Sequence, residues 1–176
     1  MQLQDQIESY KVTWGVGRIL EEIRKYPEKK LTSQQKNFLR VQEFDAEVMN
    51  GGLFIYFFNY GEHAQRAVVA LSEVGATRSA ALLQSAIDEW PNQQVPSSQA
   101  ERKEILDKID PEHTHWGEID QKIFAQTENL TMLCLRYAKE NSILKFKLTR
   151  PFARLFNYIS DEITLRKTSS KLKSLR

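Results

Sequence analysis

The stretch Glu47-Val48-Met49-Asn50-Gly51-Gly52-Leu53 decides how this chain folds. Asn and Gly tolerate the left-handed backbone conformation that closes a helix, so Asn50-Gly51-Gly52 is predicted to end one helix. The helix before it carries four apolar residues on one face, namely Phe38, Val41, Phe44 and Val48. Residues 53–58, Leu-Phe-Ile-Tyr-Phe-Phe, are apolar all round and predict a buried helix directly after the junction, although a buried strand would show the same run.

Capping signals and apolar stripes place the neighbouring helices. Thr32–Gln35 and Ser98–Glu101 have the pattern of capping boxes, which begin helices. One apolar stripe that ends near Gly75 and a second that ends at Pro91 predict two helices in an antiparallel hairpin. A further pattern, predicted to be one longer helix entered at Trp116, consists of Ile119, Ile123, Leu130, Leu133 and Tyr137.

The C-terminal part of the chain has a different pattern. Residues 144–149 alternate between apolar and polar, as an extended segment does, and Pro151 fits the first turn of a following helix. From Lys167 onward the chain is rich in Ser and Lys and is predicted to fray. We therefore expect an all-α fold, with one compact domain of about seven to eight helices over residues 1–166 and a basic tail at residues 167–176. The pattern allows one short extended segment near residues 143–149.

Composition and charge narrow the class of protein. With 176 residues, 41% of them hydrophobic and 27% charged, the chain has the make-up of an ordinary globular domain. Cys134 is the single cysteine and the N-terminus lacks a signal-peptide pattern, so a cytoplasmic protein is expected. The net charge of +2 is uneven, because residues 1–140 carry 16 Lys or Arg against 21 Asp or Glu, whereas residues 141–176 carry 9 against 2.

Three carboxylates crowd the end of the helix that leads into the junction: Glu43, Asp45 and Glu47. The helix macrodipole already places partial negative charge there, and an acid at such an end costs up to about 1 kcal/mol. Arg40, Arg66 or water could satisfy these acids. A second interpretation is a binding pocket formed by Glu43, Glu47, Asn50, Gly51, Gly52 and Asn59. A third is a two-carboxylate metal or acid–base site, although the Glu-x-x-His pattern of helical carboxylate sites does not occur at the junction, where Ala46 and Asn50 stand three residues after Glu43 and Glu47.

The residues around the junction resemble a helical domain of unknown function that is shared with the DNA-mimic protein family. The resemblance rests on Glu47-Val48-Met49-Asn50-Gly51-Gly52-Leu53, on Tyr56-Phe57 with Asn59, and on Ala70-Leu71 with Gly75-Ala76, and it covers residues 33–90. Two residues depart from the family pattern, since Leu53 stands where Phe is usual and Ile55 where Gln is usual. The resemblance implies a helical fold and protein binding rather than catalysis.

The resemblance also raises the question of DNA mimicry, in which carboxylates are displayed as DNA displays its phosphates. The densest run of acids comprises Glu101, Glu104, Asp107, Asp110, Glu112, Glu118 and Asp120. Acids three residues apart drift by about 60° per step around a helix. Lys103 and Lys108 lie among them, and the overall charge is positive. A regular phosphate-like row of carboxylates is therefore not predicted.

Two other stretches could carry chemistry. His113-Thr114-His115, with Glu112 and Glu118 nearby, could hold a metal, but its place after Pro111 favours a solvated loop. The basic C-terminal segment could contact nucleic-acid phosphates through Lys145, Lys147, Arg150, Arg154, Arg166, Lys167, Lys171 and Lys173.

The sequence thus favours a non-enzymatic protein-interaction or regulatory module whose partner is another protein. We expect it to use the surface around Glu43, Glu47, Asn50 and Asn59. No catalytic residue, metal, cofactor or membrane association is predicted. The alternatives are a nucleic-acid-binding protein that uses the basic C-terminal segment, and an enzyme or metal-binding protein with a carboxylate site at the junction.

Overall fold

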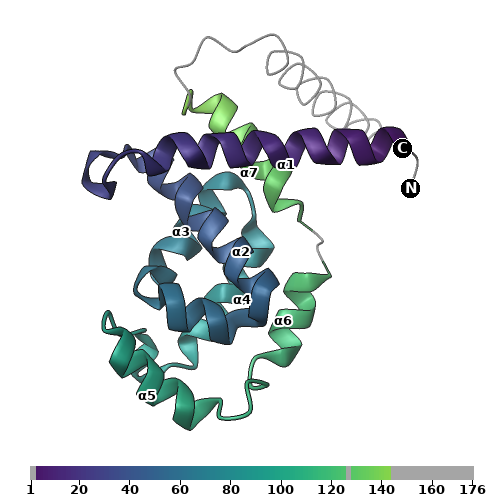
Figure 1. Ribbon diagram of the computed structural model, residues 1–176. Coiled ribbons are helices and arrows are strands. Elements are labelled where there is room, and N and C mark those ends of the chain that lie inside the picture. The colour runs from purple at the N-terminus through teal and green to yellow at the C-terminus, as the bar shows by residue number, and fades with distance from the viewer. Residues whose placement is uncertain (1–2, 126–127, 144–176) are drawn as a thin grey trace, which may run out of the picture.

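The computed structural model describes residues 3–125 and 128–143, with side chains from Trp14 onward. Over these residues the chain forms seven α-helices and no strand, which confirms the all-α prediction. They are α1 (Leu3–Arg24), α2 (Ser33–Tyr60), α3 (Ala64–Val74), α4 (Thr77–Asp88), α5 (Gln99–Ile109), α6 (Gly117–Phe124) and α7 (Leu130–Glu140) (Figure 1). Three short 3-10 turns lie between them: η1 (Glu28–Lys30), η2 (Gly61–His63) and η3 (Pro91–Gln93).

Several sequence predictions fall outside the described residues. They are the extended segment near residues 143–149, apart from Ile143 itself, the helix that begins at Pro151 and the basic tail at residues 167–176. Within the described residues, none of the helices combines the length and the apolar character that crossing a membrane requires.

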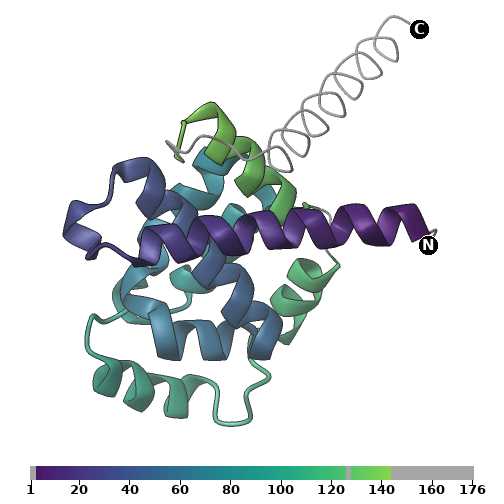
Figure 2. The same ribbon diagram turned by 45° about the horizontal axis from the view of Figure 1, so that its top comes forward.

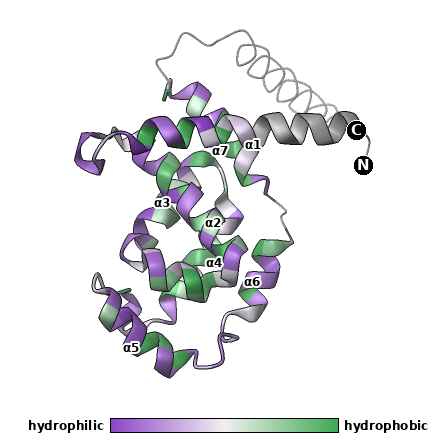
Figure 3. Cartoon of the chain, viewed as in Figure 1, coloured by the Kyte–Doolittle hydropathy of each residue, from purple (hydrophilic) through white to green (hydrophobic). Residues whose placement is uncertain are grey.

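Helix α2 is the centre of the fold. It contacts α3, α5, α6 and α7, while α1 lies across one end of the molecule against α7 (Figures 1 and 2). The hydrophobic residues gather on the inside of this arrangement, whereas α5 is largely hydrophilic (Figure 3). The fully buried side chains that α2 supplies to the core include Phe38, Val41, Phe44, Leu53 and Phe57. Both halves of α2, before and after the junction, therefore build the same core.

Local signals placed the helix ends well. The Thr32 hydroxyl accepts from the Gln35 amide and the Gln35 side chain accepts from the Thr32 amide, which confirms the capping box that begins α2. Gly75 adopts the left-handed conformation at the end of α3, with φ of 89°. Helices α3 and α4 pack against one another as the predicted hairpin. The Ser98 hydroxyl accepts from the Glu101 amide at the start of α5.

The prediction of one long helix over residues 119–137 is wrong. Two helices, α6 and α7, take its place, and α6 ends at Phe124. The physical reason for the new start is Asn129, whose side-chain oxygen accepts from the Met132 amide at 2.9 Å and so caps α7. Trp116 is 2% exposed and directly precedes α6, as expected of a residue that packs at a helix entrance.

The α3–α4 turn is held by two charged residues that are distant in sequence, Glu128 and Arg136. Arg136 on α7 donates to the Val74 carbonyl at 3.1 Å, at the negative end of α3. Glu128 accepts from the backbone amides of Arg78 and Ser79 at 2.9 and 2.8 Å, at the positive end of α4. Each charge has the sign that the neighbouring helix dipole favours, so the turn is both hydrogen-bonded and electrostatically complemented.

Cys134 lies on α7 at the centre of the packing and is fully buried. The Gln42 side-chain amide approaches its sulfur at 3.4 Å. Burial raises the pKa of the thiol to about 12, against the smaller effect of the Gln42 contact. The cysteine is therefore a packed, protonated core residue.

Candidate functional site

The backbone of α2 breaks at the predicted junction. Gly51 has φ of −170° and ψ of 29°, and Gly52 has φ of 72° and ψ of −171°, so neither residue is helical. The conformation of Gly52 is one that only glycine adopts readily. Residues 53–58 then continue as helix, with Leu53, Tyr56 and Phe57 buried and the other three partly exposed. The chain direction thus changes at the glycine pair without leaving the core.

An acid distant in sequence completes the junction. Asp120 on α6 accepts from the Leu53 backbone amide at 2.9 Å and so caps the helix that starts after the glycines. A side chain at residue 52 would overlap the Asp120 carboxylate, which is a second reason, besides the backbone conformation, for glycine at this position. Burial raises the pKa of Asp120, partly offset by the hydrogen bond from Leu53. Because 67 residues separate the two partners, no local sequence signal could have predicted this contact.

Glu43 is not at the surface. Its side chain is 10% exposed and forms an ion pair with Arg40, which also pairs with Glu28 at 2.5 Å. Burial raises the pKa of Glu43, and the Arg40 guanidinium acts in the opposite direction. Arg40 is thus the compensating partner, one of the three considered from the sequence, and Glu43 belongs to an inner charge cluster between η1 and α2.

Glu47, in contrast, lies at the rim of the junction. The Asn59 side-chain amide donates to the Glu47 carboxylate at 2.7 Å, which links the two halves of α2 across the break. Asn50 and Asn59 are exposed, Gly51 is exposed and Gly52 is buried. The structure therefore brings together Glu47 and Asn59, leaves Asn50 beside the break, and separates Glu43 from this group.

Two residues that the sequence did not single out belong to the same region. Tyr60 ends α2, and burial together with the nearby Glu43 and Glu47 carboxylates raises the pKa of its phenol. Met49, next to Asn50, is 50% exposed, which is high for a large apolar side chain. The rim thus combines a carboxylate, two amides, a phenol and an apolar side chain. These groups can bind a polar surface.

The arrangement does not resemble a metal centre. Among residues 14–125 and 128–143, no cluster of three His, Cys, Asp or Glu side chains is placed to hold an ion. His113 stacks on Phe54 with ring centroids 3.7 Å apart, whereas His115 pairs with Glu89 at 2.5 Å. The two histidines considered from the sequence are therefore engaged with different partners.

Charge is divided along the chain around the junction. Residues 43–128 carry 15 Asp or Glu against 6 Lys or Arg, whereas the rest of the chain carries 8 against 19. Some of these acids are internal, among them Glu43 and Asp110. Others are exposed, including Glu62, Glu73, Asp88, Glu101, Glu104, Glu112 and Glu118. The middle of the chain, from the junction to α6, is therefore its acidic part.

The described residues thus form a bundle of short helices around a central helix that is kinked at Asn50-Gly51-Gly52. The model of the DMP19-like protein family matches residues 29–141, which run from η1 to α7. The chain belongs to the DMP19-like protein family. Comparisons with curated proteins and with solved structures found no match.

Proposed function

We propose that this protein is a non-enzymatic interaction module that binds a DNA-binding protein through its acidic part. The observation that carries the proposal is the division of charge, with 15 acidic and 6 basic residues between residues 43 and 128. A protein that binds DNA presents a basic surface to phosphates, and exposed carboxylates can occupy that surface. Membership of a DNA-mimic-like family supports the same class of partner.

The binding residues that we propose are Glu47, Asn50 and Asn59, together with the exposed backbone at Gly51. Asn50, Gly51 and Asn59 are exposed at a break in the central helix, and the half-buried Glu47 stands beside them at the helix end where the macrodipole disfavours an acid. Places where a local rule fails are enriched in functional sites. Glu43 no longer belongs to the proposed surface, because its buried pair with Arg40 gives it a structural role.

Exposed acids continue from the junction onto α5. The buried Arg102 donates to the Phe58 carbonyl at 3.2 Å and pairs with Glu62 at 2.7 Å, so the start of α5 lies beside the end of α2. Glu62, after the end of α2, and Glu101, in the first turn of α5, are both exposed near the Arg102 contact. Lys103 pairs with Asp107 at 2.6 Å, and this ion pair reduces the net negative charge farther along α5. We therefore propose that a partner contacts the end of α2 and the first turn of α5 together.

The test is capture of the partner from the native cell with immobilised protein. A triple variant, Glu47→Gln with Glu101→Gln and Glu104→Gln, should lose the captured protein, and duplex DNA should displace that protein from the wild type. The control is Glu21→Gln with Glu140→Gln, which removes two exposed acids outside residues 43–128 and should leave capture unchanged.

Two results would contradict the proposal. One is a captured protein that is retained by the triple variant or is not displaced by DNA. The other is direct binding of duplex DNA to this chain with steep weakening by salt, which would favour the basic C-terminal segment as the functional part instead.

A further inference from the structure

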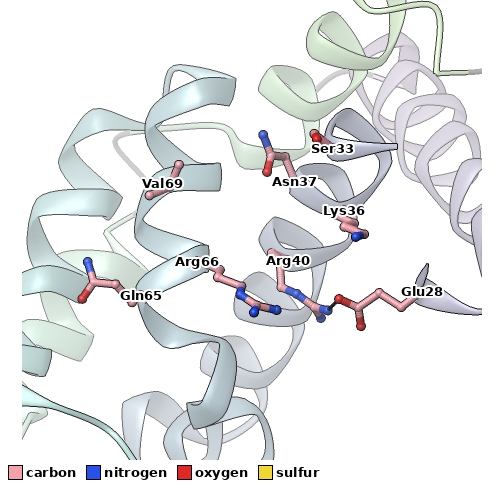
Figure 4. Close-up of a pocket in the computed structure, with 8 residues that line it drawn as sticks. All are labelled: Glu28, Ser33, Lys36, Asn37, Arg40, Gln65, Arg66 and Val69. Atoms are coloured by element: carbon pink, nitrogen blue, oxygen red, sulfur yellow. Dashed lines mark ion pairs between the residues drawn. The ribbon is translucent and has the colours of Figure 1, made fainter. Parts of the chain in front are cut away.

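A second site candidate lies at the first turns of α2, away from the Asn-Gly-Gly break. A cavity of about 430 Å³ opens between η1, the first turns of α2 and the start of α3 (Figure 4). This volume is in the lower range of small-molecule sites. The residues that line the cavity are Glu28, Ser33, Lys36, Asn37, Arg40, Gln65, Arg66 and Val69.

The charge of this cavity is the reverse of the charge of the junction. Lys36, Arg40 and Arg66 face a single lining carboxylate, that of Glu28. Figure 4 shows the guanidinium groups of Arg40 and Arg66 directed toward the same space, with Glu28 opposite Arg40. Within the described part of the chain, the side chains of Lys36 and Arg66 form no hydrogen bond and no ion pair. Two cations thus line the cavity without an ion-pair partner among the described residues.

Arg40 provides a fixed base for the site. It is 3% exposed and pairs with both Glu28 and Glu43, so its position is set by the fold. Its Nη2 nitrogen lies 2.5 Å from a carboxylate oxygen of Glu28, which lines the same cavity. Ser33, in the first turn of α2, adds the positive end of a long helix to the same cavity.

We propose that this cavity binds a small molecule through a phosphoryl group. Arginine forks and lysine ammonium groups together form the donor set that phosphate prefers. Val69 is 55% exposed and supplies an apolar wall for the remainder of the ligand. The Asn37 amide nitrogen donates to the Tyr137 hydroxyl at 3.1 Å, and Asn37 lines the cavity, where its side-chain oxygen can accept from a ligand hydroxyl. This site is independent of the protein-binding function proposed above.

His63 offers an internal reporter of occupancy. Burial lowers the pKa of its imidazole, and Arg40 and Arg66 lower it further, against Glu62 and Glu28. An anion between the two arginines would offset their effect and raise the pKa of His63. The chain has three histidines, and His113 and His115 contact Phe54 and Glu89 instead. Their imidazole resonances therefore serve as controls within the same sample.

The experiment is a titration of the whole protein with inorganic phosphate at constant ionic strength, followed by NMR of the imidazole resonances. We expect a saturable shift of His63 and a higher His63 pKa, with His113 and His115 unchanged. Phosphate binding should weaken roughly tenfold in Lys36→Gln and in Arg66→Gln. Lys122→Gln and Arg78→Gln, which remove exposed cations elsewhere, should bind phosphate as the wild type does.

Three outcomes would overturn the proposal. They are the absence of a saturable His63 shift at tens of millimolar phosphate, an equal response to chloride, and an equal loss of binding in the two control variants. The last would show that only the net charge of the protein matters. Circular dichroism of each variant establishes that it is folded, and none of the four substituted side chains is buried.

Discussion

Two places in this molecule join one helix to the next through a glycine of positive φ. At the junction within α2 that residue is Gly52, with φ of 72°, and at the α3–α4 turn it is Gly75, with φ of 89°. In both places a distant carboxylate caps the helix that follows, Asp120 at Leu53 and Glu128 at Ser79. The second helix of each pair therefore starts in the same way.

The two places differ in how the first helix ends. The end of α3 receives Arg136, a cation at the negative pole of the dipole. The end before the junction carries Glu47, whose partner is the neutral Asn59 amide. The α3–α4 turn thus follows the electrostatic rule at both poles, and the junction follows it at one. Glu47 is thus an acid whose position does not favour the stability of its own helix. This difference from the α3–α4 turn supports the junction as the binding region.

Substitution of Gly52 and of Gly75 should give the largest difference in stability between the two places. Gly52→Ala should lower the free energy of unfolding by about 3 kcal/mol, because the backbone conformation excludes a side chain and Asp120 would have to move. Gly75→Ala should cost only about 1 kcal/mol, since its conformation is left-handed helical and the nearest group is the flexible end of Arg136. Urea unfolding of both variants measures the difference. Equal losses would refute the special role assigned to Gly52.

The two acids before the junction should respond unequally. Glu43→Gln should destabilise the protein by about 2 kcal/mol, because the buried Arg40 would keep Glu28 alone as its partner. Glu47→Gln should change stability by no more than about 0.5 kcal/mol, since its side chain is at the rim. Thermal unfolding of the two single variants makes this check, and a larger loss in Glu47→Gln would place that residue in the structural network.

The capping carboxylate of the α3–α4 turn provides the next prediction. Glu128→Gln should cost about 1 kcal/mol, because the Gln side chain keeps only one of the two oxygens that accept from Arg78 and Ser79. Glu73→Gln, an exposed acid on α3, is the matched control and should leave the melting temperature nearly unchanged. A cap without energetic value would give the two variants the same melting temperature.

The smallest effect concerns Asp45 and pH. Burial raises the pKa of Asp45 above its usual value of 3.8, so the folded state holds this proton more tightly than the unfolded state does. The carboxylate therefore reduces stability as pH rises through that raised pKa, and its cost is complete at neutral pH. Asp45→Asn should stabilise the protein by roughly 0.5 kcal/mol at pH 7, with the gain shrinking toward pH 4. A gain that is constant over this range would exclude titration of Asp45 as its cause.

The sequence predicts this fold wherever the deciding contact is local. The Thr32 capping box, the helix end near Gly75 and the glycine junction are signals within four residues, and all three are confirmed. The start of α7 also has a local signal, because Asn129 can cap a helix and directly precedes an apolar run. The helical spacing between Ile123 and Leu130 instead favoured one continuous helix.

What the sequence could not predict depends on contacts between distant residues. Asp120 looks like one of the two acids in the first turn of α6, and only the packed structure places it at Leu53. Arg40 looks like a surface arginine, yet it is 3% exposed between two carboxylates. The candidate site changes for the same reason: sequence spacing grouped Glu43 with Glu47, whereas burial separates them. Periodicity identifies the side of a helix, but it does not identify which neighbour covers that side.

Cys134 is the single thiol of this protein, and its burial makes its rate of chemical labelling a measure of how often the core opens. Because the sulfur is fully buried and its pKa is raised to about 12, a thiol reagent in solution reaches no reactive thiolate in the folded chain. The rate of labelling therefore reports how often α7 separates from the bundle. One built-in probe thus follows the dynamics of the core without any engineered label.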